Sequence, residues 1–416
     1  MNYNTLLSSH GIPPEDCFEI EYLTNDNEIM IFAKIKPNQR KCIYCNYPDS
    51  RIKEYKKKII KSLPTGKDST IIYFTLPRYV CPNCNKTYTH NLNSFTSNSI
   101  TKSLKDKLIE KFATICTFKS IAKDYDLSLS QTINIFDESC PDLRVPFSDA
   151  LCIDEFYNIR TSDFKYACIL IDFISHKIID IIPSRTTPYL DQYFTKIPLK
   201  IRENVKYIIT DMYDGYISAA NKWFRNATVA IDPFHYMQYL TDAVQNIRRR
   251  ILSDDSLFFF DKSWMNTNWR LLTTNPKNFP SKNMTLKSGL SISYYDRVLK
   301  FVSQNSELHY AFLKLQSIYL EFNNITFSKA HSFVHSIINS LLSSTSPEFV
   351  ECGKTWFHYQ DYIINSFIIH NGKRLSNGPI EGTNKRVKEL KNIMSGYRNN
   401  IRFYKRIILV QIHKKW

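Results

Sequence analysis

Glycine is scarce in this chain, with only nine among 416 residues. The shortage argues against glycine-rich phosphate loops, and neither G-x-G-x-x-G nor a Walker sequence occurs. No run of 18 apolar residues is present, so we expect no membrane span. The opening sequence MNYNTLLSSHGIPPEDC has no long apolar core, so we expect no secretory signal peptide. Internal repeats and low-complexity tracts are also missing, which excludes solenoid and fibrous proteins.

The composition indicates a folded, basic protein. Hydrophobic residues make up 43% of the chain and aromatic residues 14%, which is ample for a packed core, and the length suits two to four domains. The 55 lysines and arginines outnumber the 39 aspartates and glutamates, giving a net charge of +16 and a pI near 9.2. This charge suits a polyanionic partner, and a basic protein without such a partner stays open as an alternative.

Four of the ten cysteines form two C-x-x-C pairs, Cys42 with Cys45 and Cys81 with Cys84. Each pair places two sulfurs on one side of a tight turn, and two turns complete a tetrahedron around zinc. The 35 residues between the pairs are enough for a β-hairpin, so we predict a zinc ribbon with one structural Zn²⁺. The alternatives are four unligated core cysteines or a redox pair, although a thioredoxin-like pair needs one C-x-x-C within a βαβ unit. The other six cysteines are scattered in apolar segments, which fits a reducing cytoplasm.

Two features near the cysteines bear on DNA binding. The segment RIKEYKKKIIKSL (51–63) predicts a charged strand whose lysines would face phosphates, although a solvated strand face explains each lysine equally well. His90 is interpreted as a surface or DNA-facing residue, because four cysteines already complete the zinc site.

Hydrophobic periodicity predicts the order of the remaining elements. Residues 17–40 predict two short strands, and residues 99–140 predict helices. Strands alternate with helices over 150–232, which indicates an α/β sheet. Residues 234–367 are almost entirely helical in pattern, and residues 378–416 predict a strongly basic helical end.

The sequence FKSIAKDYDLSLSQTINIFD (118–137) predicts a helix-turn-helix. Asp126, Leu127 and Ser128 would form the turn, and a polar start to the second helix would face base edges. Many helical pairs share this pattern, and the neighbouring zinc module and the basic charge favour a unit that reads DNA. The predicted DNA-contacting residues of this helix are Ser130, Gln131 and Thr132.

Three separated acidic residues carry the strongest chemical signal. Asp154 lies in an apolar strand pattern, where a carboxylate is costly unless it binds something, and Asp211 ends another strand pattern. Glu381 follows Asn-Gly-Pro and lies in the first turn of a predicted helix. Each residue alone is explained as well by a cap, turn or salt bridge. Together they predict a cage for two Mg²⁺ (or Mn²⁺) ions that cut phosphodiester bonds.

A basic flank follows Glu381 on the same predicted helix. Residues four and seven positions later share the helix face of Glu381, so they could hold a DNA strand against the metals. A solvated basic face is the alternative. The residues predicted to bind DNA here are Lys385, Arg386, Lys388 and Lys391.

The chain resembles the DDE transposases of bacterial insertion sequences, of the ISL3 family, over almost its full length. The resemblance is carried by RYVCPNC, by IDEF around Asp154, by TDMYDGY around Asp211, by DPFHYMQ and by SNGPIEGTNKRVKELKNIMSGYRN. It implies an RNase H-like core with catalytic Asp154, Asp211 and Glu381, and an all-helical insertion between the second aspartate and the glutamate. The D-x-x-H element of DPFHYMQ makes Asp232 and His235 accessory candidates, with a helix cap and a satisfied histidine as the alternative.

The expected fold class is therefore multidomain α/β, with an RNase H-like mixed-sheet core split by an all-helical insertion. A zinc ribbon and a helical helix-turn-helix domain precede this core. The expected boundaries are 1–95 for the N-terminal strands and zinc ribbon, 96–145 for the helix-turn-helix, 146–250 for the first part of the core, 251–369 for the insertion and 370–416 for the last part of the core.

The resemblance implies a transposase that binds terminal inverted repeats and catalyses metal-dependent phosphodiester hydrolysis and strand transfer. The alternatives are a catalytically inactive DNA-binding regulator and an RNase H-fold nuclease that only cuts. The expected partners are the element ends and target DNA, with a homodimer or higher oligomer on DNA because two ends must be brought together. The expected location is the bacterial cytoplasm, associated with the nucleoid.

Overall fold

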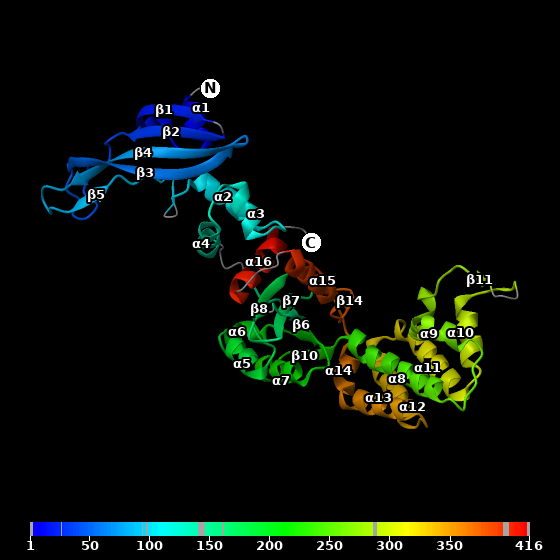
Figure 1. Ribbon diagram of the computed structural model, residues 1–416. Helices are drawn as coiled ribbons and strands as arrows, with labels where there is room; N and C mark the ends of the chain where they lie inside the picture. Colours follow the sequence, from blue (N-terminus) through cyan, green and yellow to red (C-terminus); the bar gives the residue numbers. More distant parts are fainter. Residues whose placement is uncertain are drawn as a thin grey trace. The chain divides into compact units, whose positions relative to one another are not determined.

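The protein is described by a computed structural model that covers residues 3–25, 27–93, 95–96, 99–139, 146–159, 162–285, 289–393 and 399–413. The chain forms two compact units. The first contains Met1–Leu143 and Val387–Trp416, and the second contains Arg144–Arg386. Figure 1 shows both units, with most of their helices and strands labelled.

A five-stranded sheet dominates the first unit, preceded by α1 (Tyr3–Ser9) and a short turn of 3-10 helix at Pro14–Asp16. The strand order is β1-β2-β4-β3, with β5 also paired to β4, and β2 and β4 run parallel whereas the other pairs are antiparallel. Alternation decides which face is buried, because Ile31, Ala33 and Ile35 point into the core and their neighbours do not. The strands predicted at 17–40 and 51–80 are confirmed as β1 (Cys17–Asn25), β2 (Glu28–Ile35), β3 (Arg51–Thr65) and β4 (Asp68–Val80), and β5 (Thr87–Thr89) is added.

Four helices complete the first unit: α2 (Lys102–Phe112), α3 (Phe118–Asp124), α4 (Leu129–Ser139) and α16 (Asn400–His413). The rings of Phe112, Phe118 and Phe136 meet edge to face, with centroids 5.1–5.8 Å apart. Arg406 of α16 is fully buried beside these rings, and its guanidinium donates to the carbonyl oxygen of Thr114.

The compact units divide the C-terminal segment differently from the predicted domains. The sequence assigned residues 370–416 to the catalytic core, whereas Val387–Trp416 belongs to the first unit. The physical reason is the buried face of α16, where Arg406 and Leu409 pack against the α2–α4 helices. The boundary between the units falls within α15 (Gly378–Ile393).

The second unit is built on a mixed five-stranded sheet with the order β10-β9-β6-β7-β8. The pairs β6–β7 and β7–β8 are antiparallel, and β6–β9 and β9–β10 are parallel. The strands predicted within 150–232 are confirmed as β6 (Ala150–Tyr157), β7 (Tyr166–Asp172), β8 (Ile178–Ile182), β9 (Tyr207–Thr210) and β10 (Thr228–Ile231).

Helices α5 and α7 pack on one face of this sheet, against the side chains of Leu151 and Ile153 (Figure 1). The helices predicted between the strands of 150–232 are α5 (Thr187–Thr195) and α7 (Asp214–Trp223), and the structure adds the short α6 (Leu199–Glu203). The carboxyl ends of β6 and β9, which run parallel, lie at the same edge of the sheet.

The segment after β10 is mostly helical, and Trp356 is fully buried in its core, where the indole N–H donates to the Tyr236 carbonyl oxygen. The expectation of an all-helical insertion at 251–369 is wrong in detail, since two-residue strands pair at Met284–Thr285 (β11) with Ser291–Ile292 (β12). A second two-residue pair lies at the end of the insertion, at Ile369–His370 (β13) with Lys373–Arg374 (β14). Periodicity cannot detect strands of two residues. The helices are α8 (Pro233–Ser253), α9 (Lys262–Thr267), α10 (Tyr294–Val302), α11 (Ser306–Phe322), α12 (Phe327–Leu342), α13 (Pro347–His358) and α14 (Gln360–Asn365), with 3-10 turns at Trp269–Thr273 and Pro276–Asn278.

Within the described parts of the chain, no helix is both long enough and apolar enough to cross a membrane.

Candidate active site and zinc centre

The four paired cysteines converge as predicted. Their Sγ atoms lie within 4.8 Å of one another, with 3.7 Å between Cys42 and Cys84 and 3.5 Å between Cys45 and Cys81. Zinc–sulfur bonds of about 2.3 Å in a tetrahedron separate the sulfurs by about 3.8 Å, so the four thiols fit one Zn²⁺. One cysteine pair precedes β3 and the other follows β4, so the four thiols lie at the open end of the β3–β4 hairpin, as predicted for a zinc ribbon.

The two cysteine turns have the same backbone design. In each turn, the residue after the second cysteine is an asparagine in the left-handed region, Asn46 with φ 59° and Asn85 with φ 55°. Their N–H groups donate to the carbonyl oxygens of Cys42 and Cys81, at 3.0 and 2.9 Å. Asparagine tolerates positive φ better than other residues with a side chain, which explains why both pairs read C-x-x-C-N.

His90 does not face DNA as the sequence suggested. His90 is 4% exposed, and its ring hydrogen-bonds the Tyr79 hydroxyl at 3.3 Å, so this histidine is part of the packed interior of the ribbon.

Three carboxylates meet at the edge of the second unit's sheet. Asp154 and Glu155 lie near the end of β6, and Asp211 directly follows β9. One oxygen from each lies within 4.8 Å of the others. Oxygens bound to one Mg²⁺ at about 2.1 Å are at most about 4.2 Å apart, so a small closure would bring these three into coordination. Asp154 and Asp211 are therefore brought together as predicted, and Glu155 is an addition that the sequence analysis missed.

Glu155 was missed because alternation along β6 places adjacent side chains on opposite faces of the sheet. Asp154 lies on the face of Asn384, and Glu155 lies on the face that α5 and α7 cover. At the open edge of the sheet both carboxylates can still turn toward Asp211. The adjacent acids in IDEF were the only signal for Glu155 in the sequence.

Burial and mutual repulsion disturb the titration of the site. Burial, together with the charges of Glu155 and Asp232, raises the pKa of Asp154 from 3.8 to about 7, although hydrogen bonds from the Glu155 N–H and Asn384 oppose the shift. Burial, together with the charges of Glu155 and Asp154, raises the pKa of Asp211 to about 8, although Arg185 and a hydrogen bond from Thr210 oppose the shift. Buried acids that repel one another are stabilised by a bound cation, so this edge of the sheet suits divalent metal ions.

Arg185 supplies one positive charge to this cluster. Its guanidinium forms an ion pair with Glu155 at 2.6 Å and lies against the rings of Tyr166 and Tyr213, at 4.6 and 4.7 Å from their centroids. The second Glu155 oxygen, Oε2, is buried and has no hydrogen-bond partner among the described residues. One arginine therefore neither neutralises the three carboxylates nor provides hydrogen bonds to all of their oxygens.

The second turn of α15 lies beside Asp154. The Asn384 amide donates to Oδ2 of Asp154 at 3.1 Å and to the Glu155 carbonyl oxygen at 3.2 Å. Glu381 is three residues before Asn384, and residues three apart lie on the same helix face. The side chain of Glu381 itself lies outside what the structure describes.

Asp232 and His235 lie at the start of α8. Asp232 occupies the N-cap position without capping the helix, and its carboxylate accepts from the Asn377 N–H at 2.7 Å. Asp232 thereby ties α8 to the segment that leads into α15. Burial lowers the pKa of His235, and the charge of Glu155 opposes that shift, which places the ring within the field of the acidic cluster.

The predicted DNA-contacting residues lie on two helices, α4 and α15. In the first turn of α4, Ser130 is exposed and Gln131 is half-buried. The backbone N–H of Gln131 donates to the Ser128 hydroxyl. Thr132 was wrongly included, because it is fully buried and its hydroxyl donates to the Ser128 carbonyl oxygen at 3.0 Å. On α15, Lys385, Arg386 and Lys388 are exposed and Lys391 is half-buried, as a DNA-facing flank requires.

Two family models match the sequence. A transposase model, that of the ISL3 group of DDE enzymes, matches residues 151–407. A zinc-finger model, described as that of the transposases of IS204, IS1001, IS1096 and IS1165, matches residues 38–84. No curated protein matches the chain. Because the first match covers more than half of the sequence and includes the carboxylate cluster, the chain belongs to the ISL3 family of DDE transposases.

Proposed function

We propose that this transposase cuts and joins DNA at the ends of an insertion sequence, with Asp154, Asp211 and Glu381 as its catalytic carboxylates. The observation that carries the proposal is the meeting of Asp154 and Asp211 at one sheet edge, where Asn384 of α15 contacts Asp154. The contact from Asn384 supports Glu381 as the third carboxylate, because Glu381 lies one turn earlier on the same helix face.

The core is proposed to be RNase H-like. The support is a mixed sheet in which three antiparallel strands, β6, β7 and β8, are followed by β9 and β10 parallel to β6. In this arrangement the first and fourth strands of the core are neighbours, so residues 154 and 211 meet although 56 positions separate them. The segment 251–369 would then be an insertion between Asp211 and the α15 that carries Glu381.

Two divalent cations, Mg²⁺ or Mn²⁺, would activate the attacking hydroxyl and stabilise the leaving oxygen. The residues of the chain prepare this site. The Glu155 N–H and Asn384 orient the two oxygens of Asp154, at 2.7 and 3.1 Å. Arg185 holds Glu155 at the cluster, where this fourth carboxylate can share in binding the second ion. Hydrolysis and strand transfer are the same displacement at phosphorus with water or a DNA 3′-hydroxyl as nucleophile, so one site serves both steps.

DNA would be held by three surfaces of the chain. The zinc ribbon and the turn between α3 and α4 would bind the inverted repeats, with Ser130 and Gln131 at the start of the recognition helix. The basic flank of α15 would hold the strand being cut, through Lys385, Arg386, Lys388 and Lys391. Because two element ends must be joined, we infer at least a dimer on DNA, acting in the cytoplasm where bacterial DNA lies.

The proposal is tested with DNA from either side of the gene, where short inverted repeats are expected. Purified protein with Mg²⁺ should bind such an end, release a 3′-hydroxyl and join it to a plasmid. The variants Asp154→Asn and Glu381→Gln should bind the end with unchanged affinity and neither cut nor join, and Asp163→Asn, an exposed acid of the same unit, is the matched control.

Two outcomes would support the rival functions. Cutting without any joined product indicates a nuclease of the same fold. Unchanged activity in cells for the Asp154→Asn and Glu381→Gln variants indicates a DNA-binding regulator.

A further inference from the structure

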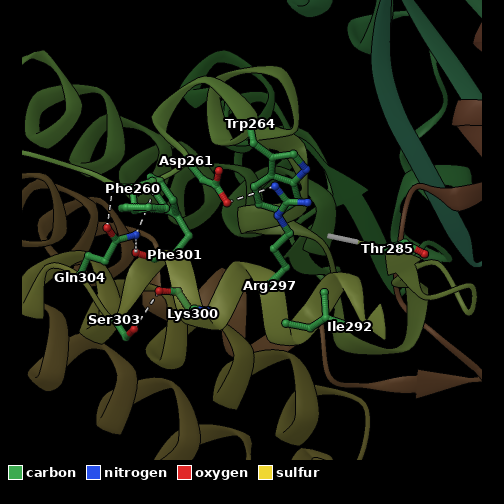
Figure 2. A pocket seen from close by; sticks show the side chains of 10 residues that line it. All are labelled: Phe260, Asp261, Trp264, Thr285, Ile292, Arg297, Lys300, Phe301, Ser303 and Gln304. Carbon is green, nitrogen blue, oxygen red and sulfur yellow. Dashed lines mark hydrogen bonds and ion pairs between the residues drawn. The ribbon is translucent and has the colours of Figure 1, made fainter. Parts of the chain in front are cut away.

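The helical segment of the second unit contains a cavity that the proposed chemistry does not use. Its volume is about 860 Å³, within the range of ligand pockets, and it lies between α9, α10 and the β11–β12 hairpin. Figure 2 shows its lining, in which aromatic side chains stand beside cations. The residues that matter for recognition are Phe260, Trp264, Arg297, Lys300 and Gln304.

Two phenylalanines at the cavity are unusually exposed. Phe258 is 85% exposed and Phe260, which lines the cavity, is 72% exposed, and their ring centroids are 6.4 Å apart. Phe259 between them is buried and stacks on Phe301, with centroids 5.6 Å apart. Exposed aromatic side chains on a fixed backbone indicate a binding surface rather than a fraying loop.

Gln304 fixes the backbone at this position. Its side-chain oxygen accepts from the Phe260 N–H at 2.7 Å, and its amide donates to the Phe260 carbonyl oxygen at 3.2 Å. These two bonds hold Phe260 as a neighbouring β-strand would (Figure 2). The backbone at Phe260 is therefore ordered before any ligand binds, which lowers the entropic cost of binding.

The cations of the cavity suit an anionic ligand. The Arg297 guanidinium lies 4.2 Å from the Trp264 ring centroid and forms an ion pair with Asp261 at 3.1 Å. Its Nε is buried and has no partner among the described residues, and Lys300 on the next turn of α10 is exposed. Across residues 254–304 the sequence has seven lysines and arginines against four aspartates, a difference of +3.

We propose that this cavity binds an unpaired base of a DNA strand, stacked on Phe260, with its phosphates near Arg297 and Lys300. The proposal rests on the proposed function in taking DNA as the partner. Aromatic rings and cations at one site match single-stranded nucleic acid, because rings stack on bases and cations neutralise the backbone. Paired DNA buries its base faces in the helix stack, so a duplex could not use the rings.

The test compares two DNA probes: a 20-base-pair blunt duplex, and the same duplex with a four-thymine single-stranded end. The full chain carries Asp154→Asn throughout, so that neither probe is cut. We expect it to bind the single-stranded end more tightly than the blunt duplex. The double variant Phe258→Ala/Phe260→Ala should reduce this preference by about tenfold and leave affinity for the blunt duplex unchanged, from the usual effect of losing one stacked base.

The control variant is Phe357→Ala, which removes another exposed phenylalanine, on α13. It should change neither affinity. A conservative variant, Phe260→Tyr, should keep the preference because it keeps the ring. A 5-iodouracil in the single-stranded end should also crosslink to a peptide containing Phe258–Trp264, which locates the base directly.

Three results would overturn the inference: equal binding of both probes by the parent chain, an equal loss in Phe357→Ala, or a crosslink outside the cavity. A double variant that changes only the oligomeric state would show that the rings bind protein. The proposed function is tested separately, by assaying metal-dependent DNA cutting with the protein that has Asp154. An absence of cutting would refute the proposed function, and the comparison of binding to the two probes would still hold.

Discussion

Replacing Asp211 by asparagine should stabilise the metal-free protein at pH 8 while removing its activity. Asp211 is 8% exposed, and burial together with the charges of Glu155 and Asp154 raises its pKa from 3.8 to about 8. A raised pKa means that the folded state binds the proton more tightly than the unfolded state. The stabilisation from that proton is therefore complete below about pH 4 and is lost as the pH rises through 8.

The magnitude follows from the size of the pKa change. A pKa that moves from 3.8 to about 8 corresponds to at most about 6 kcal/mol at high pH, at about 1.4 kcal/mol for each tenfold change. Asp154 and Asp211 share their repulsion, so removing one charge should recover about 2 kcal/mol. For a unit of this size, that corresponds to a rise in Tm of roughly 4–8 °C.

The assay is thermal unfolding in EDTA at pH 5.5 and pH 8. The Tm of the wild-type protein should be lower at pH 8 than at pH 5.5. The Tm of Asp211→Asn should decrease less over the same pH range and should not change when Mg²⁺ is added. The matched control is Asp191→Asn, because hydrogen bonds from Lys222 and Trp223 lower the pKa of Asp191, and its neutralisation should lower Tm at pH 8. An Asp211→Asn protein no more stable than wild type at pH 8 would refute the reasoning.

Three further predictions concern other parts of the chain. Cys81→Ser should lower the zinc content measured by mass spectrometry and make the β3–β4 hairpin protease-sensitive, whereas Cys352→Ser, in α13, should retain zinc. Asn384→Ala should slow DNA cutting about tenfold in a gel assay and lower Tm by roughly 4–8 °C, since it loses two hydrogen bonds that orient the Asp154 region, each of about 1 kcal/mol. Gln131→Ala should weaken binding of the inverted repeat in fluorescence anisotropy, and Thr132→Val should not, because Thr132 is buried; equal losses would place α4 away from the DNA.

Much of the architecture could be predicted from sequence because its signals are local or strongly periodic. The C-x-x-C-N repeats specify the two cysteine turns, and the apolar runs ending at Asp154 and Asp211 specify neighbouring strands. Features that depend on tertiary packing were not predictable in this way. The burial of Thr132 depends on its helical neighbours, and the assignment of α16 to the first unit depends on the aromatic cluster around Arg406.

Glu155 illustrates a different limit. Strand alternation predicts that its side chain points away from Asp154, and for most of β6 that rule holds. At the strand end, the open edge and the ion pair with Arg185 let Glu155 join the cluster. Pattern rules fail most readily at such edges, where function often lies.

The most direct test of the central claim is the anomalous scattering of Mn²⁺ in crystals of the chain with an element end. The account predicts two peaks about 3.5–4 Å apart. Both should lie among the carboxylate oxygens of Asp154 and Asp211, with Glu381 coordinating at least one. Peaks bound by Asp154, Glu155 and Asp211 with Glu381 turned away, or no peak at this edge of the sheet, would contradict it.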